Sequence, residues 1–293
     1  MSISKELDLA IKMAEGHTAA DGYAAGGRIY NTYMTNSEWD AFLASMLPGA
    51  LAEYGGGSGG ELIGKNGRPP KMACYGSSGR MIYLLSRGKQ GFHYEKKLPT
   101  TVGGTANLDG FLEDGDRYIF VEAKCHEPYS AKHDAVSKSY ERLYRFINGQ
   151  MAGNVEIVMT PSKCGRYMDV AYFSEGERLA YFDMKQMICH LLGIATGILK
   201  KELSQKQIDF IYLLYDPTDL DLAPATKERV DAIYERTCYE CNLVDFAALL
   251  RAILAFLKEE GYGDALSDEA LEGIVCAFTF TLASQEFYPI LLQ

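Results

Sequence analysis

Apolar and polar side chains alternate along this chain with two different spacings, and the change between them predicts which segments are helices and which are strands. Helical spacing runs through three N-terminal stretches, where Ser37 is expected to cap the second helix and Pro48 to kink or split it. Strand-like alternation follows and ends in the apolar sequence RYIFVEAK. The expected helices are residues 2–14, 37–54 and 77–86, and the expected strands are residues 92–98, 107–112 and 117–124.

The second half of the chain predicts more helices, a further strand pair and one buried strand. Residues 208–215 (IDFIYLLY) form a continuous apolar run, as in strands that are covered on both faces. Two other apolar runs, residues 246–257 and 273–283, are interpreted as buried helices. The remaining expected elements are helices over residues 133–148 and 183–200, strands over 155–160 and 168–173, and helical structure from residue 226 to the end.

This order of elements predicts an α/β fold. A helix, a three-strand meander, a helix and a strand are expected to form a mixed central sheet flanked by helices. We expect residues 61–220 to form this core, with an insertion at about 125–181. Helical extensions are expected over residues 1–60 and over residues 221–293, the latter packed on the core.

The second and third strands of the meander are joined by Glu113-Asp-Gly-Asp116, and Asp-Gly between two apolar runs is a strong hairpin signal. With Asp-Gly as the two turn residues, Asp109 lies opposite Phe120 and diagonal to Glu122, with Cα atoms about 7–8 Å apart. Since side chains alternate along strands, Asp109, Glu122 and Lys124 share one face of the sheet. Two carboxylates at this separation can hold a magnesium ion between them.

Charged side chains on so apolar a strand call for an explanation, because buried charges require partners or a metal ion. For an isolated Glu-x-Lys triplet, the simplest explanation is a structural ion pair at an exposed sheet edge. Here the triplet Glu122-Ala-Lys124 ends an apolar strand and is joined by Asp109 on the neighbouring strand. This combination favours a functional site.

Composition narrows the choice of partner. The chain has 293 residues, of which 47% are hydrophobic and 23% charged, as in ordinary globular proteins. Its formal net charge of −10 argues against an extensive DNA-binding surface, although divalent cations could neutralise part of an acidic site. The nearest approach to a basic patch is on the expected insertion helix, where a solvated helix face explains it equally well. This patch comprises Lys132, Lys138, Arg142 and Arg145.

Cysteine usage and the lack of long apolar runs bear on the compartment. Seven scattered cysteines are typical of reduced thiols, and no signal peptide or membrane span is apparent, so we expect a cytoplasmic protein without a membrane partner. The Cys238-x-x-Cys241 pair lacks a second pair at zinc-ligand spacing and is expected to place two thiols near one helix face. His126 is either a structural loop histidine or a substrate contact.

The hairpin sequence NLDGFL … YIFVEAK resembles the signature of the PD-(D/E)XK nuclease superfamily, which has the restriction-endonuclease-like fold. The resemblance implies that Asp109 and Glu122 ligate Mg²⁺, for which Mn²⁺ can substitute, with the Ala123 carbonyl as a further oxygen ligand. It also implies that Lys124 orients or deprotonates the attacking water. Leu108 stands where members of the family often have proline, which is a common departure.

Two further features extend the resemblance. Many members carry Gln-x-x-x-Tyr on the helix after the third strand, and Gln186 followed by His190 is similar, although Gln186 is equally compatible with an ordinary helix-surface residue. The family often places a catalytic glutamate upstream, and Glu61 and Glu53 are both candidates, with Glu61 slightly favoured. Arg80 is a candidate phosphate contact.

The resemblance implies magnesium-assisted hydrolysis of DNA phosphodiester bonds by a restriction-type endonuclease or a related repair or defence nuclease. The alternative is a non-catalytic nucleic-acid-binding or assembly protein that keeps the fold, which the intact Asp109, Glu122 and Lys124 disfavour. An acid–base hydrolase such as a glycosidase is also disfavoured, because Lys124 would hold Glu122 ionised. Cutting both strands of a duplex often requires a two-fold dimer, so a homodimer is compatible with this function.

Overall fold

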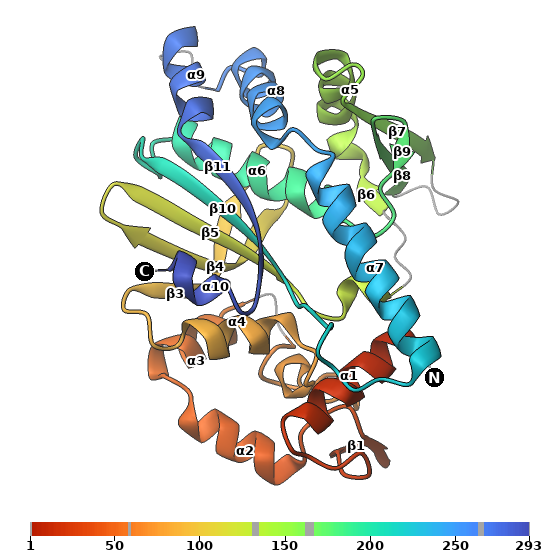
Figure 1. Ribbon diagram of the computed structural model, residues 1–293. Coiled ribbons are helices and arrows are strands. Elements are labelled where there is room, and N and C mark those ends of the chain that lie inside the picture. Colours follow the sequence, from red (N-terminus) through yellow and green to blue (C-terminus); the bar gives the residue numbers. More distant parts are fainter. Residues whose placement is uncertain (1, 58–59, 131–134, 162–166, 263–266, 293) are drawn as a thin grey trace.

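A five-stranded mixed sheet forms the centre of the protein, in a computed structural model that describes residues 2–57, 60–130, 135–161, 167–262 and 267–292 (Figure 1). Its strands are β3 (Phe92–Pro99), β4 (Thr105–Asp114), β5 (Arg117–Lys124), β10 (Gln207–Leu214) and β11 (Phe278–Ser284). They lie in the order β11-β10-β5-β4-β3, with parallel pairing from β11 to β5 and antiparallel pairing from β5 to β3. The prediction of an α/β fold with a mixed central sheet flanked by helices is confirmed.

The middle strand, β5, is buried along almost its whole length. Phe120 points into the hydrophobic core on one face, and Ile119 and Val121 point into the core on the other face. Because helices cover both faces, the strand is apolar on both sides, and its charged side chains at positions 122 and 124 are buried as well.

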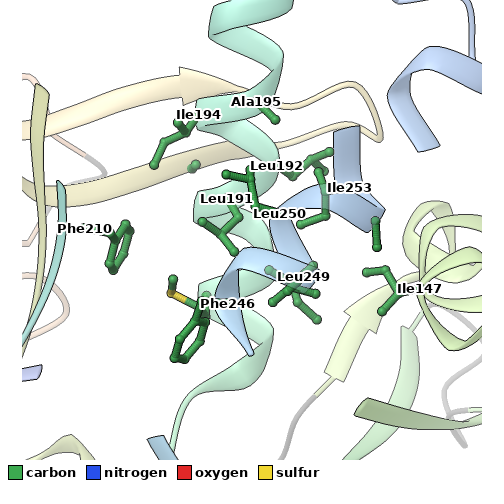
Figure 2. Close-up of a cluster of buried hydrophobic side chains, with 14 of the residues drawn as sticks. Ile147, Leu191, Leu192, Ile194, Ala195, Phe210, Phe246, Leu249, Leu250 and Ile253 are labelled. Atoms are coloured by element: carbon green, nitrogen blue, oxygen red, sulfur yellow. The ribbon is translucent and has the colours of Figure 1, made fainter. Parts of the chain in front are cut away.

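One face of the sheet is covered by helices from the second half of the chain. Figure 2 shows Leu191 and Leu192 of one helix beside Leu250 and Ile253 of another, with Phe210 of β10 on the side of the first helix away from the second. The helices of this layer are α5 (Glu141–Gln150), α6 (Met184–Leu199), α8 (Phe246–Glu259) and α9 (Asp268–Cys276). Within the described ranges, no helix is long and apolar enough to cross a membrane.

The opposite face is covered by helices from the first part of the chain (Figure 1). The helices α3 (Pro48–Gly55) and α4 (Ser78–Ser86) lie against the sheet, and α1 (Ile3–Ala14) and α2 (Asn36–Ser45) pack further out in the same hydrophobic cluster. Pro48 begins a new helix, so the expected split at this residue is confirmed. The predicted cap is wrong by two residues, because Thr35, not Ser37, forms a capping box with Glu38.

Two small sheets lie outside the central one. Within residues 1–60, a hairpin joins β1 (Tyr23–Ala25) to β2 (Arg28–Tyr30), so this segment is not wholly helical as expected. Between β5 and α6, a second sheet has the order β6-β8-β7, with β9 paired to β8. Its strands are β6 (Ala135–Ser137), β7 (Val155–Pro161), β8 (Tyr167–Ser174) and β9 (Glu177–Arg178).

The predicted helix over residues 133–148 is wrong in its first part. Positions 133 and 134 lie outside the described residues, and β6 and the short 3-10 turn η3 (Lys138–Tyr140) precede α5. Ser137 breaks the helix pattern, because its hydroxyl accepts a hydrogen bond from the backbone N–H of Ser139 and so caps the turn.

The C-terminal part is not wholly helical either. After α7 (Pro224–Asn242), α8 and α9 comes β11, followed by the short α10 (Tyr288–Leu291). The prediction of a helix over residues 273–283 is therefore wrong from Phe278 onward. The sequence FTFTLAS alternates with a period of two and supplies a parallel partner for β10, whose backbone groups would otherwise be unpaired at the sheet edge.

Candidate active site

The hairpin that carries the candidate site turns at Gly115 and Asp116, with Asp114 paired to Arg117. Gly115 has φ +58°, which glycine adopts without strain, and Arg117 forms an ion pair with Asp114 at 3.1 Å. The predicted turn at Asp114-Gly115 is therefore wrong by one residue, and the predicted register is wrong by two. An even shift leaves every side chain on its expected face.

The corrected register brings the two carboxylates closer together than predicted. The ladder between β4 and β5 ends at Gly110 paired with Val121, and its continuation places Asp109 opposite Glu122 rather than opposite Phe120. Backbone pairing stops there because the Asp109 side chain takes over: its Oδ2 accepts a hydrogen bond of 2.7 Å from the backbone N–H of Ala123. In the part of the chain that the structure describes, no hydrogen bond reaches the other oxygen, Oδ1.

Glu122 is buried, with both carboxylate oxygens bonded. Oε1 accepts a short hydrogen bond from the Lys124 ammonium group, and Oε2 lies 2.8 Å from Nε2 of His190. Burial alone would raise the pKa of Glu122, but Lys124 and His190 hold it below its usual value. Burial likewise opposes the charged form of Lys124, yet Glu122 raises its pKa well above the usual value. The pair is therefore charged at neutral pH.

The helix α6 supplies two polar side chains to this pair. The side-chain oxygen of Gln186 accepts a hydrogen bond of 2.6 Å from Lys124, and His190 lies one turn further along the same helix. The helix can approach the sheet this closely because residue 193 is a glycine. A Cβ atom at this position would lie only 2.6 Å from the Cβ of Ala106, which is too close for two carbon atoms. Gln186 and His190, the positions similar to Gln-x-x-x-Tyr, therefore both reach the charged pair.

The negative charge of Asp109 is less well balanced by neighbouring groups than that of Glu122. Burial raises its pKa well above the usual value, and the negative charge of Glu122 raises it further, while Lys124 and the Ala123 N–H offset this only in part. An ionised carboxylate in this position is electrostatically costly for the folded protein. A bound cation would remove that cost.

Glu95 joins Asp109 and Glu122 in an acidic cluster, and it was not expected from the sequence. Backbone pairing between β3 and β4 continues on both sides of Glu95, but the residue itself has φ +53° and lies across from Asp109. Burial, together with the charge of Glu61, raises its pKa. The available signal was the broken alternation at Glu95-Lys-Lys97, where three charged residues interrupt a strand.

Of the two upstream glutamates, Glu61 is the one whose charge raises the pKa of Glu95. It is 9% exposed, accepts a hydrogen bond of 2.7 Å from Lys71, and acts on Glu95. Glu53 instead bonds the exposed His93 at 2.6 Å and the backbone N–H of Tyr94 at 2.7 Å. Glu61 is thus linked to this site through Lys71 and Glu95, whereas Glu53 is bonded to His93 and Tyr94 of β3.

The other candidate residues have partners of their own. Arg80 forms a two-pronged ion pair with Glu15, at 2.8 and 2.5 Å. In the suspected basic patch, Arg142 pairs with Glu260 at 2.6 Å and Arg145 with Glu141, while Lys132 lies outside the described residues. Neither Arg80 nor the described arginines of the patch present an uncompensated charge to a nucleic acid.

A cavity of about 400 Å³ opens beside the site, at the face of α6 that carries Gln186 and His190. Tyr140 and Lys185 contribute an aromatic ring and a positive charge to its wall, and Asn107 of β4 contributes an amide. Its volume falls within the range of small-molecule sites. The lining can therefore offer stacking, hydrogen bonding and charge to a polar ligand, and it meets the charged pair through Gln186 and His190, which bond Lys124 and Glu122.

Cys238 and Cys241 lie in α7, and the described residues bring no third metal-binding side chain to them.

Comparisons with family models, with curated proteins and with solved structures find no match to this chain.

Proposed function

We propose that this protein is a metal-dependent nuclease that hydrolyses phosphodiester bonds of DNA, with Asp109, Glu122 and Lys124 at the centre of its active site. The observation that carries the proposal is the meeting of these three side chains on adjacent strands. Asp109 is left with a costly negative charge and an oxygen without a hydrogen bond in the described structure.

The donor set fits a hard cation. Asp109, Glu122 and the Ala123 carbonyl offer oxygen atoms only, which is the preference of Mg²⁺, and Mn²⁺ accepts the same ligands. The raised pKa of Asp109 supports this assignment, because a cation would stabilise its ionised form. When bound, the metal ion would polarise the phosphate and lower the pKa of a water molecule.

The chain's own residues have separable tasks in this proposal. Glu122 keeps Lys124 protonated, so that the ammonium group places positive charge beside the nucleophile and the developing charge on the phosphate. Gln186 fixes the ammonium group from the side of α6, and His190 fixes the carboxylate of Glu122. Glu61 and Glu95 add negative charge on the side of Asp109, where the cation would be held.

The order of elements supports the same assignment. The helix α4, the meander β3–β5, the helix α6 and the strand β10 follow one another as the resemblance to the restriction-endonuclease-like fold implies, and we propose that they form such a core. The second sheet and α5 would then be the insertion between the third strand and the helix. The cavity beside Gln186 would receive the nucleotide next to the scissile bond.

A cleavage assay tests the proposal. Supercoiled plasmid, single-stranded DNA and RNA are incubated with the full chain in Mg²⁺, Mn²⁺ or EDTA. We expect cleavage of DNA with either metal and none in EDTA, and a loss of about 10²–10³-fold for Lys124→Met. Lys206→Met is the matched control, because Lys206 pairs with Glu113 at the far end of the same hairpin.

Asp109→Asn provides a second test with its own control. We expect it to lose cleavage, while Asp209→Asn on β10 keeps it. Absence of metal-dependent cleavage of every substrate by the wild-type chain would overturn the proposal, as would full activity of Lys124→Met. Binding of DNA without cleavage would favour a non-catalytic nucleic-acid-binding protein instead.

A further inference from the structure

A second cluster of metal-binding side chains lies outside the candidate active site. Asp8 of α1, Cys74 after the short turn η1 (Lys71–Ala73), and His126 after β5 bring one ligand atom each to within 4.8 Å of the others. The Oδ1 atom of Asp8 lies 2.8 Å from Nδ1 of His126. Among the described residues, this is the one group of three or more such ligands.

The cluster is enclosed but not sealed. Asp8 and Cys74 are 5% and 2% exposed, whereas the side chain of His126 is 31% exposed. A ligand could therefore reach the three atoms past the imidazole ring. The backbone of Cys74 is held by its bridge to Tyr33, and its thiol is hydrogen-bonded to His126.

The chain leaves room for these atoms at Gly76. A Cβ atom at this position would lie 1.8 Å from Oδ1 of Asp8 and 3.1 Å from Nδ1 of His126. The backbone of Gly76 therefore forms one wall of the cluster, and only a residue without a side chain allows the carboxylate and the imidazole to meet there.

We propose that Asp8, Cys74 and His126 bind a zinc ion, with a water molecule in the fourth coordination position. In a tetrahedral site with ligand bonds of about 2.0–2.3 Å, the ligand atoms lie roughly 3.3–3.8 Å apart. The observed separations, from 2.8 Å to at most 4.8 Å, fall on both sides of this range, so movements of side chains alone can complete the site.

The type of ligand selects the metal. A thiolate and an imidazole favour zinc over magnesium, which prefers oxygen ligands. Binding would displace the proton of the Cys74 thiol and the proton shared between His126 and Asp8, and both would pass to solvent. The all-oxygen donor set around Asp109 is a different site, and this inference does not depend on the proposed function.

The position of the cluster indicates what the zinc ion would do. Asp8 belongs to the N-terminal helix, and His126 follows Lys124 by only two residues. The ion would therefore tie α1 to the end of the strand that carries Glu122 and Lys124. Because it would bind the folded state alone, zinc would stabilise the protein against unfolding.

Metal analysis and cobalt spectroscopy test the inference. The full chain is stripped with a chelator, titrated with Zn²⁺ or Mg²⁺, and analysed by mass spectrometry of the elements after gel filtration. We expect one zinc ion per chain and no competition by excess Mg²⁺. With Co²⁺, a thiolate-to-cobalt absorption band and intense d–d bands typical of tetrahedral geometry should appear.

Variants separate this site from the rest of the molecule. Cys74→Ser should lose the thiolate band and bind zinc at least about 10-fold more weakly, as should His126→Gln. The controls Cys238→Ser and Asp109→Asn should bind zinc like the wild-type chain. A folded wild-type chain that binds no zinc would overturn the inference, and so would a Cys74→Ser variant that keeps the cobalt spectrum.

Discussion

The buried pair of Glu122 and Lys124 makes a strong prediction about stability. Their side chains are only 2% and 6% exposed, and removing one partner of a buried ion pair costs about 3–5 kcal/mol, because the other charge is left uncompensated. Methionine in place of Lys124 keeps the packing of the aliphatic stem and removes the ammonium group, with its hydrogen bonds to Glu122 and Gln186. His190 still bonds Glu122 at 2.8 Å, so we expect a loss near the lower limit, about 3 kcal/mol.

This loss is large enough to measure by two methods. For a chain of 293 residues, the entropy of unfolding is about 0.6 kcal/mol per kelvin, so Lys124→Met should lower Tm by roughly 5 °C. Urea unfolding in EDTA gives the free energy of unfolding directly, and an unchanged m value would show that the same surface is exposed in both proteins.

A double-mutant cycle isolates the interaction between the two charges. Glu122→Gln alone leaves Lys124 uncompensated, whereas the double variant buries neither charge. The double variant should therefore lose at least about 2 kcal/mol less than the sum of the two single losses. Two outcomes would refute the reasoning: losses that simply add, or a loss in Lys124→Met no greater than in the half-buried control Lys206→Met.

Two further predictions concern neighbouring positions. The pKa of Asp109 is raised in the folded state, so its ionisation destabilises the protein as pH rises above the pKa of the unfolded chain, about 4. Asp109→Asn should therefore be more stable than wild type in urea at pH 7 without metal. At pH 3.5, where this carboxyl group is largely protonated, the variant should be no more stable than wild type. A variant that is less stable at pH 7 would contradict this. Gly193→Ala should lower the free energy of unfolding in urea by about 1–3 kcal/mol, because its methyl group would overlap Ala106. The control Gly149→Ala in α5 has open space and should lose no stability. Equal stability of the two variants would show that α6 is not closely packed at Gly193.

The sequence predicted the parts of the fold that depend on local pattern. The hairpin, the alternation along β5 and the split at Pro48 all follow from side chains a few positions apart. The shared face of Asp109 and Glu122 was predictable even though the register was not, because Asp-Gly and Gly-Asp turns differ by an even shift in pairing.

What the sequence could not provide depends on contacts between distant segments. The FTFTLAS segment becomes a strand because β10 offers it a partner some seventy positions earlier. Glu95 joins the acidic cluster through a local break in β3 whose position is set by pairing with β4. The choice between Glu61 and Glu53 rested on Lys71 and His93, which pair with them only in the folded chain.

The last strand of the central sheet, β11, has a consequence for how the protein is made. Seven positions of β10, from Ile208 to Leu214, pair with it in parallel. During synthesis β10 is made before β11, so one edge of β10 lacks its hydrogen-bonding partner until residues 278–284 have left the ribosome. Nascent chains that stall before Phe278 should therefore be the species that chaperones retain or that aggregate.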